Sequence, residues 1–111
     1  MQIDVRERGR VVALTGRLDV ASVADVRLAL HAAVDDGTGD LVLDLSAVDS
    51  IDASGIGVLV GAHRRAGRGG RRLVVAASPP PVLSMLRLTR LHRVLALSPA
   101  VPATQPLAAT G

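Results

Sequence analysis

Residues 41–61 read LVLDLSAVDSIDASGIGVLVG, and this stretch decides the fold. Its first half alternates apolar and polar side chains, which predicts a strand over residues 40–46 that ends near Ser46. Its second half is apolar at helical spacing and predicts a helix from about Ser54 to Arg68. The apolar stripe expected for this helix consists of Ile56, Leu59, Val60 and a half-buried His63. Between strand and helix we expect a loop that carries Asp49 and Asp52.

Upstream of this stretch, the pattern predicts a hairpin and a helix. Residues 3–6 and 11–16 form two short runs separated by Gly9, which is typical of a hairpin. The following helix has Ser22 and Asp25 at the spacing of a capping box, and Gly37 is expected to end it. Its apolar positions are Val23, Val26, Leu30, Ala33 and Val34, with Leu28 on the opposite face.

Downstream, residues 73–77 form a continuous apolar run that fits a strand buried on both faces. Ser78 and the three following prolines predict the start of a third helix, with Ser78 as the cap and Val82, Met85 and Leu86 buried. Residues 94–97 suit a short last strand. Strands that alternate with helices predict an α/β fold: one small domain over residues 1–98 with a mixed, mostly parallel sheet of about five short strands, opened by an N-terminal hairpin. Residues 99–111 are rich in Ala and Pro, and we expect a flexible tail.

Composition removes several classes of protein. The 111 residues include no Cys, no aromatic residue and no Lys, and the three His lie far apart in sequence. Disulfides, thiolate metal sites, aromatic base-stacking platforms and Lys-based chemistry are therefore excluded. We expect no metal, no cofactor and no enzymatic activity. Because no apolar run resembles a signal peptide or a membrane span, we expect a cytoplasmic protein without a membrane partner.

Charge is divided unevenly along the chain. All ten acidic residues lie at or before Asp52, whereas eight of the 13 Arg follow it. Five of these crowd the end of the second helix and the next turn: Arg64, Arg65, Arg68, Arg71 and Arg72. We interpret this cluster as a solvated face that offsets the negative end of a helix, in preference to a polyanion site. A small basic nucleic-acid-binding domain is the alternative from another class, but no direct nucleic-acid partner is expected.

Ser54 stands where the second helix begins, at the carboxyl end of a predicted parallel strand, where sites form in α/β sheets. It could simply cap the helix. A nucleophile elbow requires glycines two residues before and after the serine, where this chain has Asp52 and Ile56. The glycines from Gly55 onward miss a dinucleotide-binding motif by one residue. The remaining interpretation is a phosphorylation switch, since a phosphate on Ser54 would add negative charge beside Asp52 and Asp49 at the positive end of a helix.

Residues 52–55 (Asp-Ala-Ser-Gly) before an apolar helix, preceded by residues 41–48, resemble the STAS domain of bacterial anti-sigma factor antagonists. Residues 16–19 and 88–91 match as well, so the resemblance covers residues 3 to about 98. It implies a partner switch: the protein binds an anti-sigma serine kinase and releases a sigma factor. Phosphorylation of Ser54 by that kinase turns it off, and a serine phosphatase reverses this.

The resemblance also implies a partner-binding surface around Ser54, made of Asp19, Asp52, Ala53, Gly55 and Ile56. From the residues alone, Asp19 could equally cap the first helix. The family usually has Gly where Arg90 stands, so we expect the third helix to lack its usual stop. Because some STAS domains serve transporters, a STAS accessory subunit of a transporter is the nearest alternative function.

Overall fold

The structure is a computed structural model that describes residues 1–7 and 9–102. Its elements follow in the order β1 (Gln2–Arg6), β2 (Val11–Leu18), α1 (Val23–Asp35), β3 (Asp40–Ile51), α2 (Ala53–Arg68), β4 (Arg72–Ala76), α3 (Pro80–Leu88), the short 3-10 helix η1 (Leu91–Arg93) and β5 (Ala96–Ser98).

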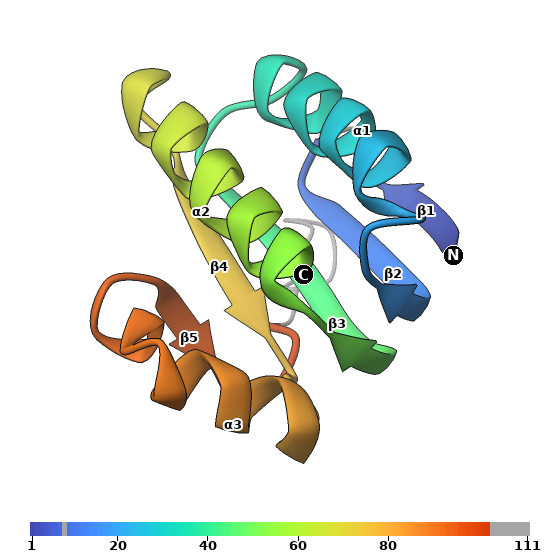
Figure 1. Cartoon of the computed structure of the whole chain (residues 1–111). Coiled ribbons are helices and arrows are strands. Elements are labelled where there is room, and N and C mark those ends of the chain that lie inside the picture. The colour runs from blue at the N-terminus through green and yellow to red at the C-terminus, as the bar shows by residue number, and fades with distance from the viewer. Residues whose placement is uncertain (8, 103–111) are drawn as a thin grey trace, which may run out of the picture.

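The described part of the chain forms a two-layer α/β domain around a five-stranded sheet of order β1-β2-β3-β4-β5. β1 and β2 pair antiparallel as the predicted hairpin, and the other neighbouring strands are parallel. Helices α1 and α2 lie side by side over one face of the sheet, and α3 packs against β3 on the same side (Figure 1). The predicted fold class is therefore confirmed.

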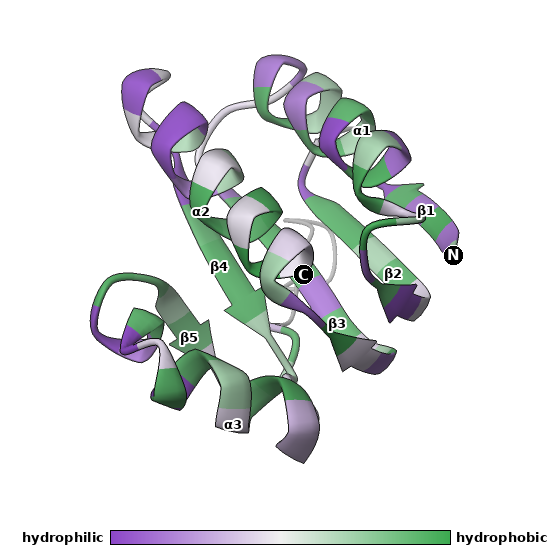
Figure 2. Cartoon of the chain, viewed as in Figure 1, coloured by the Kyte–Doolittle hydropathy of each residue, from purple (hydrophilic) through white to green (hydrophobic). Residues whose placement is uncertain are grey.

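The main core lies between this face of the sheet and the three α-helices of the described residues. The first half of β2 and β4 after Arg72 are continuously apolar, whereas polar residues such as Asp44 and Asp49 interrupt β3 (Figure 2). β4 is buried on both faces as predicted. A smaller apolar cluster, Val11, Val42, Val74 and Ala76, lies on the other face of the sheet. With no aromatic side chain available, the packing of aliphatic side chains, mostly Leu, Val and Ala, must supply the hydrophobic contribution.

The predicted end of the third strand near Ser46 is wrong, because β3 continues to Ile51 and no loop carries Asp49. β3 is extended by parallel pairing with β2, from Val11 opposite Val42 to Leu18 opposite Ile51. Two register shifts interrupt this pairing, so the apolar alternation fails after Ser46 although the strand goes on.

Two predicted helix caps are also wrong. Ser22 is the N-cap residue of α1, but its side chain makes no capping hydrogen bond, so the capping box with Asp25 does not form. Its hydroxyl donates instead to the carbonyl oxygen of Arg17 at 2.8 Å. α3 begins after Pro79, and the hydroxyl of Ser78 is buried with no hydrogen-bond partner among the described residues.

Helix α2 is rotated relative to the predicted stripe. Its buried residues are Gly55, Val58, Leu59, Ala62 and Ala66. Ile56 and Val60 are only partly buried, so of the three predicted aliphatic positions Leu59 alone is fully inside, whereas His63 is half-buried as predicted. In α3, Val82 and Leu86 are buried as predicted, whereas Met85 is half-buried.

The end of the domain is shifted from the predicted boundaries. The last strand occupies Ala96–Ser98 instead of residues 94–97, because η1 and its turn use Val94 and Leu95. Despite the missing glycine, α3 stops at Leu88, and Arg90 adopts the left-handed conformation with φ of 60°. Residues 99–102 are exposed, and the rest of the predicted tail lies outside the described residues.

Candidate functional site

Two helix-leading loops meet where β2 and β3 end side by side, and Asp52 joins them. The backbone N–H of Asp52 donates to the carbonyl oxygen of Leu18 at 3.2 Å, which continues the β2–β3 pairing by one step. One carboxylate oxygen of Asp52 accepts from the N–H of Gly55 at 3.0 Å and caps α2. The other accepts from the N–H of Val20 at 3.2 Å and holds the β2–α1 loop. Asp52 is thus the structural link between the two loops.

Ser54 occupies the second position of α2 and is partly exposed. The interpretation of Ser54 as the helix cap is wrong, because Asp52 fills that role. Its hydroxyl makes no hydrogen bond with any described residue. Since the first N–H groups of a helix have no partner within the helix, this free hydroxyl lies at the positive end of the α2 dipole.

Gly55 lets α2 begin directly against the end of β2. A Cβ atom at this position would lie 2.5 Å from the carbonyl oxygen of Leu18 and 2.7 Å from Cγ1 of Ile51. Gly55 itself is buried. Gly55 has no side chain with which to contact a partner. Among the residues predicted to bind a partner, it therefore serves to position Ser54.

Asp19 shapes the neighbouring loop without capping α1. Its carboxylate accepts from the N–H of Ala21 at 3.0 Å, which is an Asx turn. Its carbonyl oxygen accepts from the N–H groups of Ser22 and Val23, both at 3.0 Å. This turn exposes Val20, which is 74% exposed and whose N–H donates to the carboxylate of Asp52.

The residues predicted to bind a partner lie together around the hydroxyl of Ser54. Ala53 is exposed and Ile56 half-exposed on α2, and Asp19 and Val20 contribute from the other loop. Within residues 1–7 and 9–102, no group of three or more His, Cys, Asp or Glu side chains could hold a metal ion. The site therefore offers apolar contact, negative charge and one free hydroxyl.

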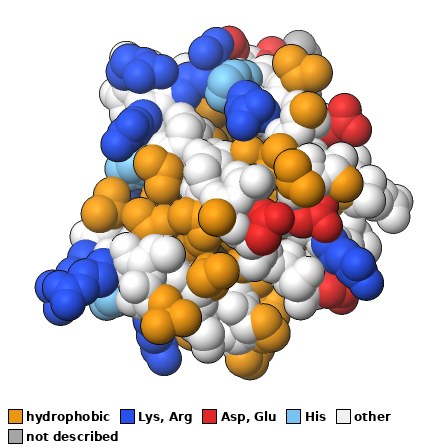
Figure 3. Space-filling view, viewed as in Figure 1, with side chains coloured by type: hydrophobic (Ala, Val, Ile, Leu, Met, Phe, Trp, Pro, Cys, Tyr) orange, Lys and Arg blue, Asp and Glu red, His pale blue; other side chains and the backbone are white. Residues whose placement is uncertain are grey.

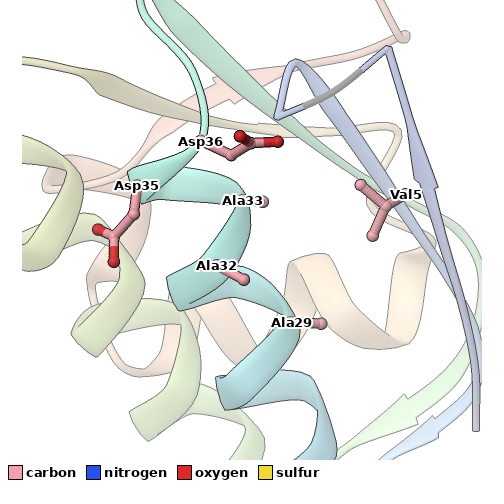
Figure 4. Close-up of a pocket in the computed structure, with 6 residues that line it drawn as sticks. All are labelled: Val5, Ala29, Ala32, Ala33, Asp35 and Asp36. Atoms are coloured by element: carbon pink, nitrogen blue, oxygen red, sulfur yellow. The ribbon is translucent and has the colours of Figure 1, made fainter.

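A separate shallow groove of about 430 Å³ lies between β1 and α1 (Figure 4). Its lining residues are Val5, Ala29, Ala32, Ala33, Asp35 and Asp36. Asp36 points toward the β1 side, whereas Asp35 points away from it. Methyl groups make up most of this lining, and its two carboxylates point to different sides, with Asp35 already paired with Arg65.

The arginine cluster does not form a uniform solvated face. Arg65 pairs with Asp35 at 2.6 Å and Arg72 pairs with Asp40 at 2.7 Å. The hydrogen bond from Arg65 lowers the pKa of the Asp35 carboxyl. For Arg71 the prediction is wrong, because its side chain is buried. Its guanidinium donates to the carbonyl oxygens of Gly9, Ala33, Val34 and Gly39 at 2.6–3.0 Å. Sequence reasoning missed this anchor, although Gly37, Gly39 and Gly70 marked the turns around it.

None of the helices in the described residues is long and apolar enough to cross a membrane.

Comparison with solved structures places this geometry among known folds. An anti-sigma factor antagonist from Mycobacterium paratuberculosis is 26% identical, with a TM-score of 0.73 over 90% of this chain and 85% of that one. A putative anti-sigma factor antagonist from Thermotoga maritima is 20% identical, with a TM-score of 0.73 over 98% of this chain and 89% of that one. A sulfate transporter family protein from Wolinella succinogenes is 16% identical, with a TM-score of 0.70 over 88% and 83%. The last two similarities, at low identity, concern the fold alone.

The family described as "Mlab, STAS domain" matches residues 1–98, which include every element of the sheet and the complete Asp52–Ser54 site. With the order of strands, the close approach at Gly55 and this match in agreement, the chain belongs to the STAS domain family.

Proposed function

We propose that this protein is an anti-sigma factor antagonist. In its unmodified form it binds an anti-sigma serine kinase through the surface around Ser54 and so releases a sigma factor. Phosphorylation of Ser54 by the kinase ends the binding, and a serine phosphatase restores it. The protein acts by binding and catalyses no reaction itself.

The observation that carries the proposal is the free hydroxyl of Ser54. Because Asp52 caps α2, the hydroxyl of Ser54 is not needed for the helix, and it is partly exposed. A kinase can therefore reach it without unfolding the helix. The similarity to anti-sigma factor antagonists supports the same interpretation.

A phosphate at Ser54 has opposite effects on the fold and on the docked partner. It would add about −1.5 to −2 charges at the helix N-terminus, where the dipole and free N–H groups favour an anion. The same charge would lie close to the carboxylate of Asp52, on a surface that already carries Asp19. A partner that fits the neutral surface then meets both added volume and added negative charge.

The test uses candidate anti-sigma kinases with ATP, followed by mass spectrometry to locate the added phosphate. We expect one phosphate, on Ser54. We also expect Ser54→Ala to bind the kinase at least as well as the unmodified protein and Ser54→Asp to bind more weakly, by about tenfold or more, which corresponds to about 1.4 kcal/mol.

Ser46→Asp is the matched control, because Ser46 is exposed on β3 and lies outside the site. It should bind like the unmodified protein. Phosphate found on another serine, or equal affinity of the Ala and Asp variants at position 54, contradicts the switch.

A second candidate is a STAS subunit of a transporter, which the similarity to the Wolinella protein favours. In that case the same surface would dock a transporter component and no kinase would modify Ser54. Absence of kinase binding together with co-purification of the chain with a transporter would favour this second function.

A further inference from the structure

The end of α3 and the following turn expose apolar and cationic side chains together. Leu88, the last residue of α3, is 80% exposed, and Val94, just after η1, is 56% exposed. Arg87, Arg90 and Arg93 alternate with them, and all three are exposed. We call Arg87, Leu88, Arg90, Arg93 and Val94 the α3–η1 patch.

Backbone hydrogen bonds hold the patch in one tight turn. The N–H of Arg90 donates to the carbonyl oxygen of Arg87 at 3.0 Å, and that of Arg93 donates to the carbonyl oxygen of Arg90 at 3.2 Å. Arg and His side chains stand out from the molecule in this region (Figure 3), at the lower left, where α3 ends and η1 follows. The cations and apolar groups are therefore presented together.

The three arginines of the patch have no partner within the part of the chain that the structure describes. Arg65, Arg71 and Arg72 are held by carboxylates or carbonyl groups, whereas the side chains of Arg87, Arg90 and Arg93 form no hydrogen bond or ion pair with any described residue. No acidic residue follows Asp52 in the sequence. The positive charge of the patch is consequently available to an outside anion.

Arg90 retains a side chain where the backbone favours glycine. Its φ of 60° lies in the left-handed region, which costs a non-glycine residue conformational energy. A strained residue at an exposed position indicates a role for its side chain, since the fold alone would be better served by Gly.

Contrary to the expectation from the sequence that the protein has no membrane partner, we propose that the α3–η1 patch is a peripheral contact for a lipid surface that carries anionic headgroups. Leu88 and Val94 project outward, so they suit insertion at the boundary between headgroups and acyl chains. The guanidinium groups beside them match phosphate oxygens in geometry and charge. A deformable anionic layer satisfies both kinds of group at once. The contact is independent of the partner switch proposed for Ser54.

The test is co-sedimentation of the full chain with vesicles of phosphatidylcholine mixed with phosphatidylglycerol, compared with phosphatidylcholine alone. We expect binding to the mixed vesicles only, weakened by salt. Each arginine near an anionic surface contributes roughly a fivefold factor, so joint replacement of Arg87, Arg90 and Arg93 by Gln should lower binding about a hundredfold. Leu88→Ser should lower it by a smaller factor and leave stability unchanged.

The matched control removes the same charge elsewhere. Arg27, Arg64 and Arg68 are exposed, are also without partners among residues 1–7 and 9–102, and lie on α1 and α2. Their joint replacement by Gln should change vesicle binding less than about threefold if the patch is the contact. An equal loss in both triple variants would show attraction by net charge and overturn the proposal. Absent binding would also overturn it and would leave an acidic protein as the partner of this patch. Equal binding to both kinds of vesicle would overturn it as well, because the headgroup charge would then have no effect.

Discussion

Replacement of Arg71 by Met should be the most damaging change of charge in this protein, although no carboxylate of the described residues pairs with it. The side chain is only 7% exposed, and its guanidinium ties the end of α1 to the turns at Gly9 and Gly39. Arg71 thus fastens the β1–β2 hairpin and α1 to the start of β4. The partial negative charge at the carboxyl end of α1, through the carbonyls of Ala33 and Val34, compensates the buried cation.

The size of the effect follows from the carbonyl groups that Met would leave behind. Gly9, Ala33 and Val34 are buried, so water cannot freely replace the lost donors. Each unsatisfied buried acceptor costs about 1–3 kcal/mol. Ala33 loses less, because its carbonyl oxygen also accepts from the N–H of Asp36 at 3.3 Å. Met also avoids the cost of burying the charged guanidinium, and this offsets a further part of the lost stability. We therefore expect a loss of about 3–5 kcal/mol, a large share of the roughly 5–15 kcal/mol that stabilises a typical domain.

The neighbouring residue provides the control. Arg72→Met removes the same charge one position away, but Arg72 is exposed and its ion pair with Asp40 should contribute less than about 1 kcal/mol. Unfolding in urea, followed by far-ultraviolet circular dichroism because the chain has no aromatic residue, gives both values. Arg71→Lys should fall between them, since an ammonium group cannot reach all four carbonyls. If Arg71→Met were no less stable than Arg72→Met, the anchoring role would be refuted.

Three further substitutions should change the stability of the fold by amounts that differ in sign and size. Gly55→Ala forces a Cβ atom against the carbonyl oxygen of Leu18, so urea unfolding should show a loss of about 2–3 kcal/mol and kinase binding should weaken with it. Arg90→Gly relieves a left-handed arginine and should raise stability by up to about 1 kcal/mol in the same assay while it weakens vesicle binding; a loss of stability would contradict the assigned conformation. Because Arg65 lowers the pKa of Asp35, this pair stabilises the fold above the ordinary pKa of Asp, and the contribution disappears as the pH falls through the folded-state pKa. Arg65→Gln should make the free energy of unfolding only slightly less dependent on pH in this acid range, because both side chains are solvated. Unfolding at a series of pH values measures this.

Sequence periodicity was sufficient for the topology but not for the ends of its elements. The antiparallel hairpin, the parallel strands and the helix that begins near Ser54 all follow from apolar spacing and turn residues. β3 could not be bounded in this way, because its last residues are strand only through pairing with β2, and the register shifts there break the alternation. The same limit explains the start of β5, where η1 and its turn include Val94 and Leu95, two residues whose sequence is typical of a strand.

At the candidate site, the sequence offered Ser54 as one possible cap of α2, whereas the structure gives that role to Asp52. Asp and Ser are equally good caps, so Asp52 and Ser54 compete on sequence alone, and only the hydrogen bond to Gly55 decides between them. For Arg71, nothing in the sequence indicates that its side chain differs from those of the neighbouring arginines. Five arginines in nine residues look alike in sequence, and burial among carbonyls distinguishes one of them only after α1 and β4 have come together.

The placement of the cap determines how a modification at Ser54 can act. If Ser54 capped α2, a phosphate would remove the capping hydroxyl and disturb the helix and the partner surface at once. With Asp52 as the cap, both carboxylate oxygens are already engaged, one within α2 and one across to Val20. Added charge at position 54 then acts on whatever approaches the surface, and the two loops remain bonded to each other. A switch of this kind needs no second conformation of the protein, because the change it makes is in charge and volume at one edge of an otherwise constant fold.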